Sequence, residues 1–126
     1  MGVKHYEELV TWQLASTLRK RVVEITRRPD VRRDLRFCDQ LRSAVASIPA
    51  NIAEGFGRNT RLEFIRFLRY ARGSAFEARE WLRDGKERGH LSEEEFDELW
   101  ALLDRSTGAL TRLLESLIEQ GASLRR

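Results

Sequence analysis

The stretch SIPANIAEGFGRNTRLEFIRFLRYARGSAFE, residues 47–77, decides the fold of this chain of 126 residues. Apolar residues spaced by about 3.6 positions over residues 41–52 mark one face of a helix. Pro49 lies inside this pattern, lacks a backbone donor and is expected to bend or loosen the helix. Gly55 and Gly57 are expected to end it, because glycine adopts the left-handed conformation at little steric cost.

A second helix is expected to begin at the far side of this turn. The Thr60 hydroxyl is placed to accept from the backbone of Glu63, and the Glu63 carboxylate to reach back, as in a capping box. Asn51, Glu54 and Arg58 therefore lie at a corner between two helices. We expect Asn51 and Glu54 to hydrogen-bond the turn, since buried polar groups need partners, with a ligand-binding or catalytic role as the alternative.

Similar periodicity predicts four long helices along the chain. The first three are expected over residues 6–28, over residues 31 or 35 to 54, and over residues 61–88. The fourth is expected to begin after a capping box at Ser92 and Glu95 and to end at Gly121. Its apolar seam has heptad spacing and comprises Phe96, Leu99, Leu103, Ser106, Leu110, Leu113 and Leu117.

The connections between these helices are short, and no strand pattern competes with them. The sequence therefore predicts a single all-α domain over residues 1–126, an antiparallel up-down-up-down four-helix bundle. In the helix at residues 61–88, Phe67, Tyr70 and Trp81 widen the apolar face beyond what one bundle requires. A long neighbouring helix or another subunit would cover the excess. We expect an oligomer interface, because tyrosine and tryptophan are frequent interface anchors.

Basic residues concentrate in the first part of the chain. Residues 1–72 carry 15 Lys and Arg against 8 Asp and Glu, whereas residues 73–126 carry 8 against 12. This asymmetry is typical of a region that faces a polyanion, or of complementary contact between subunits. Charged faces that are simply solvated are the alternative.

Five arginines fall within an arc of about 80° on the helix at residues 61–88, namely Arg61, Arg69, Arg72, Arg79 and Arg83. Contact with phosphates and ion pairing within the protein both remain open, since only Arg83 has acidic residues three or four positions away. The predicted nucleic-acid-binding residues are Arg58, Arg61, Arg69 and Arg72. They would contact phosphates and read little sequence.

A second group of arginines lies at the opposite end of the expected bundle. Arg32, Arg33 and Arg36 fall at the start of the second helix, and Arg27 and Arg28 at the end of the first. Cations at a helix start oppose the helix dipole. Such a local conflict sometimes marks a binding surface.

Motifs for catalysis, metals and cofactors are weak. The one ExxH, formed by Glu87 and His90, straddles a helix end, and GFGRNT lacks the GK[ST] ending of a phosphate-binding loop. No cofactor and no metal are expected, and the protein is not expected to be an enzyme. Two weaker enzymatic alternatives stay open. The first pairs Cys38 with a histidine, and the second groups three carboxylates, Glu54, Glu63 and Glu77.

No stretch is long and apolar enough to span a membrane, and the segment MGVKHYEEL lacks the apolar centre of a signal peptide. We therefore expect a cytoplasmic protein without a membrane partner.

The segments SIPANIAEGFGR and EFIRFLRYARGS, followed by Glu77, resemble the four-helix-bundle family named for the 23S rRNA intervening-sequence protein. Leu9, Trp12 and Gln13 are similar to an early LxxWQ-like segment of that family, and residues 40–42 to its QLR segment. The C-terminal helix after LSEEEF also fits. The resemblance covers nearly the whole chain.

This resemblance implies an antiparallel four-helix bundle that assembles as a ring-like homopentamer. It also implies kinship with the accessory protein of diversity-generating retroelements, which binds nucleic acid and a reverse transcriptase. The expected function is therefore that of a homo-oligomeric, non-enzymatic protein that binds RNA or DNA. The alternative is a protein-interaction scaffold, such as a reverse-transcriptase adaptor.

Overall fold

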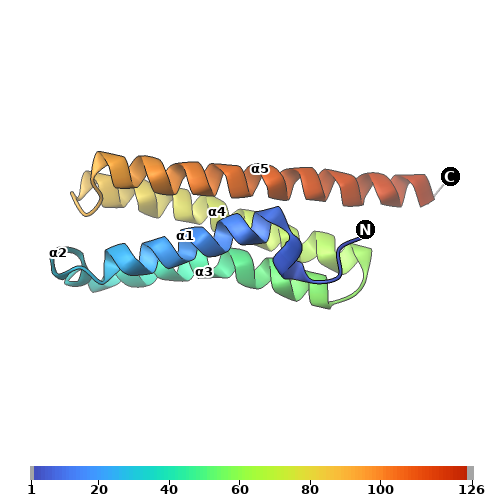
Figure 1. Cartoon of the computed structure of the whole chain (residues 1–126), viewed down its shortest axis with the longest axis horizontal. Coiled ribbons are helices and arrows are strands. Elements are labelled where there is room, and N and C mark those ends of the chain that lie inside the picture. Colours follow the sequence, from blue (N-terminus) through green and yellow to red (C-terminus); the bar gives the residue numbers. More distant parts are fainter. Residues whose placement is uncertain (1, 125–126) are drawn as a thin grey trace.

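The computed structural model describes residues 2–124, in which four long helices lie side by side (Figure 1). The elements in order are η1 (Tyr6–Glu8), α1 (Val10–Thr26), α2 (Pro29–Arg32), α3 (Leu35–Gly57), α4 (Arg61–Glu87) and α5 (Glu93–Leu124). The prediction of an all-α fold with four long helices is confirmed.

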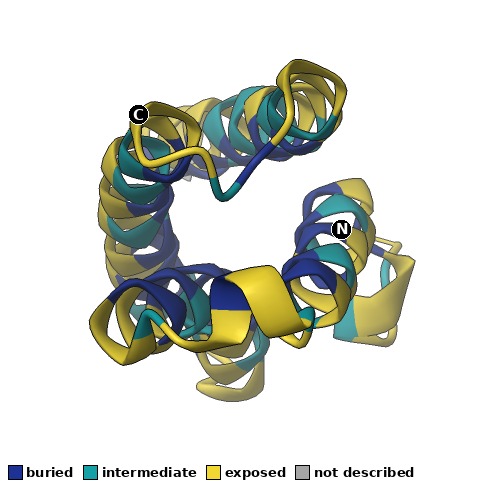
Figure 2. Ribbon diagram, turned by 90° about the vertical axis from the view of Figure 1, so that its left-hand side faces the viewer, coloured by how far each residue is buried: buried dark blue, intermediate teal, exposed yellow. Residues whose placement is uncertain are grey.

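Successive long helices run in opposite directions, and η1 and the end of α5 lie at the same end of the bundle, opposite α2 (Figure 1). Helices α1 and α4 each pack against both α3 and α5. Seen end-on, the buried faces of the helices point toward a shared core (Figure 2). Leu18, Leu41, Leu68 and Leu103 each contribute to this core from a different helix, with at most 1% of their surface exposed.

Side-chain caps define the starts of three helices. The Asp34 carboxylate accepts from the Phe37 amide at 3.2 Å at the start of α3. Thr60 Oγ1 likewise accepts from the Glu63 amide at 3.2 Å. Ser92 and Glu95 form the complete capping box that was predicted. The box at Thr60 forms only in part, because the Glu63 carboxylate pairs with arginines instead.

The first predicted helix was wrong at its beginning. Leu9 is extended, with φ −73° and ψ 126°, and separates the short η1 from α1. As a consequence Val10, the first residue of α1, is 58% exposed. Thr11 and Ala15 take the inward positions, and both are buried.

The corner between α3 and α4 also differs from the prediction. Helix α3 continues through Pro49 and Gly55 and ends at Gly57. The left-handed residue of the turn is Asn59, with φ 64°, rather than a glycine. Asparagine tolerates this conformation better than most residues, because its short polar side chain can hydrogen-bond locally. Asn51 donates back to Ser47 O at 2.8 Å and to Ser47 Oγ at 2.9 Å, so it bonds α3 itself rather than the turn.

Helix α5 extends past its predicted end. Gly121 lies inside the helix, which continues to Leu124. Gly121 is buried beneath the guanidinium of Arg61, which occupies the space that a Cβ would need. The predicted heptad seam placed Leu113 toward the core. In the structure Leu114 takes that inward position and is 3% exposed, whereas Leu113 is only half-buried.

Ser106 lies in the middle of the apolar seam of α5 and is 1% exposed. Its hydroxyl donates to Thr11 O at 2.9 Å, and the Thr11 hydroxyl donates to Ser106 O at the same distance. Each buried hydroxyl therefore has a partner on the other helix, as buried polar groups require. This exchange fixes the register between α1 and α5.

Helices α3 and α4 approach closely at three levels. A Cβ on Gly55 would lie 2.6 Å from the Cβ of Phe67, and one on Gly85 would lie 2.6 Å from Cζ of Phe37. Between these two levels Ser74 Oγ donates to Ser47 Oγ at 2.8 Å. The role of Gly55 is therefore close packing, not a left-handed turn.

We predict that Gly55→Ala lowers the free energy of unfolding by about 1–3 kcal/mol, the usual cost of overpacking a core. The reason is that the new methyl group meets the Cβ of Phe67, which moves only with the backbone of α4. Urea denaturation measures the change. Gly73→Ala is the matched control, because a Cβ there meets nothing within 4 Å. It should stabilise the protein by about 0.5–1 kcal/mol through helix propensity. Equal effects of the two substitutions would contradict the close-packing role of Gly55.

Candidate nucleic-acid interface

The predicted phosphate-binding arginines do not form one surface. Arg58 lies at the end of α3, where it pairs with Glu54 at 2.8 Å and Glu63 at 3.8 Å. Its guanidinium also covers the ring of Phe67. Arg61 turns toward α5 and donates to Leu117 O at 3.2 Å. Both side chains are thus occupied by contacts inside the chain.

Arg69 and Arg72 differ from these two. Neither forms an ion pair with any residue in the described part of the chain. Arg69 is exposed on the outer face of α4, and Arg72 is half-buried. Leu62 and Phe76, which are 67% and 54% exposed, share the outer face with Arg69.

Ion pairing accounts for other members of the arginine arc. Arg79 pairs with Asp104 of α5 at 2.7 Å and also lies over the ring of Trp100. Arg83 lies over the same ring and is 4.0 Å from Glu80. The arc therefore contains two groups. Arg61, Arg79 and Arg83 contact α5, whereas Arg69 and Arg72 have no acidic partner among the described residues.

The three residues predicted for an oligomer interface differ in how far they are exposed. Phe67 is 7% exposed, because it packs against Gly55 of α3. Trp81 is half-buried against the core. Tyr70 is 47% exposed, and its hydroxyl accepts from Arg66 Nε at 2.9 Å. Of the three, only Tyr70 belongs to the exposed surface of α4.

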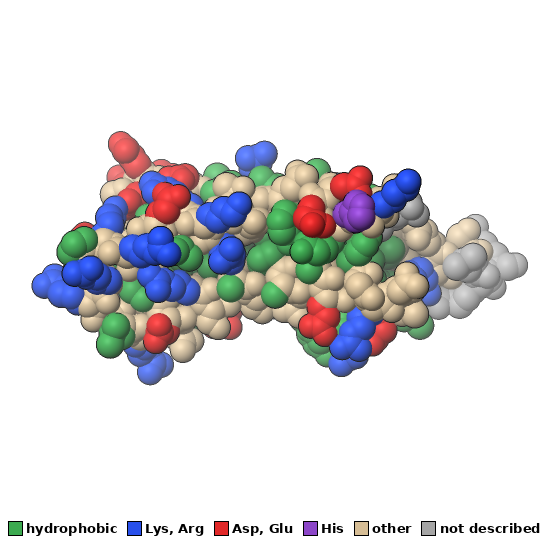
Figure 3. Space-filling model, turned by 60° about the horizontal axis from the view of Figure 1, so that its bottom comes forward, with side chains coloured by type: hydrophobic (Ala, Val, Ile, Leu, Met, Phe, Trp, Pro, Cys, Tyr) green, Lys and Arg blue, Asp and Glu red, His purple; other side chains and the backbone are tan. Residues whose placement is uncertain are grey.

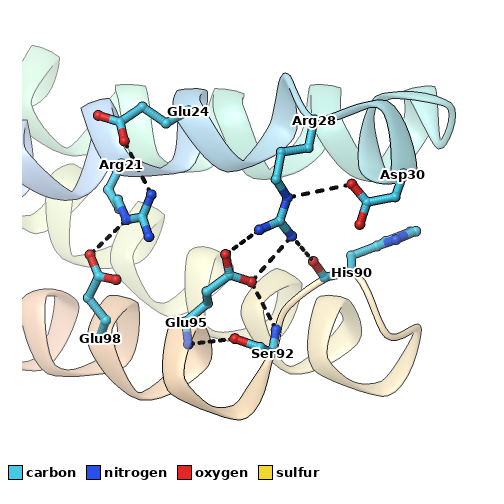
Figure 4. Close-up of polar contacts among 8 residues, drawn as sticks. All are labelled: Arg21, Glu24, Arg28, Asp30, His90, Ser92, Glu95 and Glu98. Carbon is cyan, nitrogen blue, oxygen red and sulfur yellow. Dashed lines mark hydrogen bonds and ion pairs between the residues drawn. The ribbon is translucent and has the colours of Figure 1, made fainter.

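A hollow of about 600 Å³ lies where the end of α1 meets the start of α5. Figure 4 shows that the polar side chains around it are engaged with one another. Arg28 forms a charged pair with Glu95 and donates to His90 O at 3.0 Å. Arg21 pairs with Glu98 at 2.9 Å. The hollow is therefore an open depression along the seam between two helices, and its polar side chains are engaged in ion pairs that join them.

The ionisation of Glu95 contributes to this seam. Burial opposes the charged form of Glu95. The Ser92 amide and the Arg28 guanidinium both donate to the carboxylate, and these two contacts together outweigh burial, so the pKa of Glu95 is lowered. The pKa of Asp34 is lowered as well, first by the hydrogen bond with His90 and then by the Phe37 amide. These two carboxylates connect the α2–α3 and α4–α5 turns to the rest of the bundle.

Most of the groups considered for catalysis are engaged in other contacts. Cys38 is 4% exposed, its Sγ faces the carbonyls of Thr26 and Val31, and burial raises the pKa of the thiol. Its candidate partner His90 contacts Asp34 at 2.9 Å. Glu54 and Glu63 are paired with arginines, and Glu77 is exposed.

Residues 2–124 contain no cluster of three or more metal-ligating side chains. Every helix in the same range is too short or too polar to cross a bilayer.

The fold and this surface define an all-helical bundle that carries a partly unpaired set of arginines. The chain belongs to the 23S rRNA-intervening sequence protein family, whose pattern it matches over residues 7–112. Its structure is similar to that of a protein of unknown function of the S23 ribosomal protein family from Bacteroides thetaiotaomicron. The TM-score is 0.76 at 19% identity, covering 83% of this chain and 98% of that one. No match was found among curated proteins.

We predict that Glu95→Gln lowers the free energy of unfolding at pH 7 by about 2 kcal/mol, the scale of a hydrogen bond to a charged group. A carboxyl whose pKa is lowered by folding adds stability above its unfolded pKa, about 4.3 for Glu, and loses it as the pH falls through the folded pKa. The difference between parent and variant should therefore shrink below about pH 4. Urea denaturation across pH 3–7 checks this, with the exposed neighbour Glu94→Gln as the control. A difference that stays constant with pH would contradict the role of the charge.

Proposed function

We propose that this protein is a non-enzymatic, homo-oligomeric protein that binds RNA or DNA by contacting phosphates. The observation that carries the proposal is that exposed arginines lack acidic partners in the described part of the chain. Arg69 is such an arginine on α4. Lysine and arginine that neutralise phosphates release counterions, which drives binding without reading sequence. The reference to 23S rRNA in the family description agrees with a role close to nucleic acid, although it states no activity.

The charge distribution supports the same proposal. Several acidic residues are engaged by specific arginines, such as Asp104 by Arg79 and Glu98 by Arg21. Arginines outside these pairs contribute an uncompensated positive potential, which attracts polyanions and speeds their association.

Self-association is proposed through the outer face of α4. Tyr70, Leu62 and Phe76 expose aromatic or aliphatic surface there, and such side chains are frequent in interfaces. The resemblance described above implies five subunits. Leu62 and Phe76 lie close together on the helix wheel, and Tyr70 lies on the adjacent exposed side of the same helix.

A protein-interaction scaffold, for example an adaptor for a reverse transcriptase, is the second candidate. The same three apolar residues favour it, because they would fit a partner protein as well as a second copy. Capture of one defined protein partner that survives nuclease treatment, together with no binding to nucleic acid, would favour the scaffold.

For the nucleic-acid proposal, we predict that Arg69→Gln with Arg72→Gln weakens binding to an RNA hairpin and to duplex DNA. The loss of two phosphate contacts should reduce the slope of log K against log salt for the duplex by about 2. Fluorescence anisotropy across a salt series measures both quantities. Arg105→Gln with Arg112→Gln is a control with the same change of charge, at exposed positions of α5. Equal losses in the two variants would show that only net charge matters.

For self-association, sedimentation velocity of the purified protein should give a mass several times the 14.7 kDa of one chain, and five times if the family ring forms. Tyr70→Glu should reduce that mass, because it places a charge on the proposed contact. The tyrosine is half exposed in the single chain, so the helix content of the variant should not change. A parent protein that sediments as a 14.7 kDa monomer would overturn this part of the proposal.

A further inference from the structure

We propose that the main phosphate-binding surface lies at the α2 end of the bundle, on the face formed by α1, α2 and α3. Its residues, which we call the α2-end patch, are Arg27, Arg32, Arg33 and Arg36. The ligand is the sugar–phosphate backbone of a nucleic acid. This inference rests on the proposed function and assigns it a location that differs from the arginines of α4.

All four arginines of the α2-end patch are exposed. None of them forms an ion pair within residues 2–124. Figure 3 shows lysine and arginine side chains gathered toward this end of the molecule, with acidic side chains along its edges. The patch therefore consists of four exposed arginines that follow one another closely in the chain, at one end of the bundle.

Of the acidic residues near the α2-end patch, Asp30 and Asp34 have other partners. Asp30 pairs with Arg28 at 3.5 Å. Asp34 accepts from the Phe37 amide and contacts His90 at 2.9 Å and Arg88 at 3.5 Å. Asp39 is exposed and, although it is three residues after Arg36, forms no ion pair with it. No ion pair in the described part of the chain therefore neutralises an arginine of the α2-end patch.

The starts of α3 and α5 lie at the same end of the bundle and differ in charge. Helix α5 begins with three glutamates, Glu93, Glu94 and Glu95, which the positive end of the helix dipole favours. Helix α3 has no acidic residue in its first turn and carries Arg36 there, with Arg33 immediately before the Asp34 cap. The dipole disfavours these cations. The dipole of α3 therefore does not account for these cations, whereas an external polyanion would.

The α2-end patch also differs from the arginine surface of α4. Arg69 shares its helix face with the exposed apolar residues Leu62 and Phe76. A subunit or protein that contacts those residues would narrow the access of a nucleic acid to Arg69. The α2-end patch has one exposed apolar residue beside it, Leu35, so it stays accessible in an assembly that uses α4.

An anionic membrane is a poorer fit to the α2-end patch than a nucleic acid. Membrane-surface helices insert an apolar face between the lipid headgroups. Helix α2 has only four residues, and its apolar residue Val31 is 0% exposed because it belongs to the core. Leu35 alone would remain for insertion. Flexible guanidinium groups around a positive helix start are suited to phosphates along a backbone.

The test compares three double variants of the full chain, each with two arginines replaced by glutamine. They are Arg33→Gln with Arg36→Gln in the α2-end patch, Arg69→Gln with Arg72→Gln on α4, and the control pair at Arg105 and Arg112. Binding to an RNA hairpin and to a DNA duplex is measured by anisotropy across a salt series, and thermal unfolding is measured without ligand. Arginine and glutamine have similar helix propensities, so any change reports mainly the charge.

We expect the α2-end variant to bind about tenfold or more weakly at low salt, with a duplex salt slope reduced by about 2, and to lose more affinity than either other variant. Its melting temperature should be unchanged or higher, since the dipole conflict is relieved. A purely structural role would instead lower the melting temperature and leave affinity at the level of the control.

Two results would overturn the inference in distinguishable ways. A parent protein that binds neither probe even at low salt would overturn the proposed function and the α2-end assignment together. A parent protein that binds, with the α2-end variant indistinguishable from the control pair, would overturn the assignment alone. Binding of the parent to vesicles containing phosphatidylserine, without binding to either nucleic acid, would also overturn it.

Discussion

The close approach of α3 and α4 is the constraint on which the rest of the bundle depends. Gly55 lies under Phe67 and Gly85 under Phe37, so neither position has room for a side chain. Interdigitation at this density permits little rotation of one helix against the other. Because one flank of α4 is committed to α3, its opposite flank faces α5, and this sets which arginines meet acidic partners and which face solvent.

The arginines consequently have two roles. Arg28 and Arg79 each connect two helices through carboxylates of α5, and their charges are largely compensated. The arginines of the α2-end patch and Arg69 have no such partner in the described chain. Surface ion pairs contribute little stability individually. The pairs matter here chiefly because the carboxylates that they engage do not neutralise the other arginines. What remains is a bundle whose net charge of +3 understates the positive potential at one of its ends.

Much of the fold could be predicted from local patterns, and the failures have physical causes. The Ser92–Glu95 capping box and the end of α4 close to residue 88 depend on neighbouring residues and were predicted correctly. The role of Gly55 was misassigned, because a close contact with another helix leaves no trace in local sequence. Helical periodicity placed Arg61 and Arg72 on one arc, but it did not indicate that Arg61 would bond the end of α5. The partners of a long flexible side chain depend on tertiary contacts.

The most direct test of the division between paired and unpaired arginines is an NMR titration of the arginine side-chain Nε–H signals with a short nucleic-acid duplex. The signals of Arg33, Arg36 and Arg69 should shift progressively with added duplex, and these shifts should reverse at high salt. The signals of Arg28 and Arg79 should stay in place, since their ion pairs are part of the bundle. Shifts confined to Arg28 and Arg79, or the same small shift at every arginine, would contradict the division.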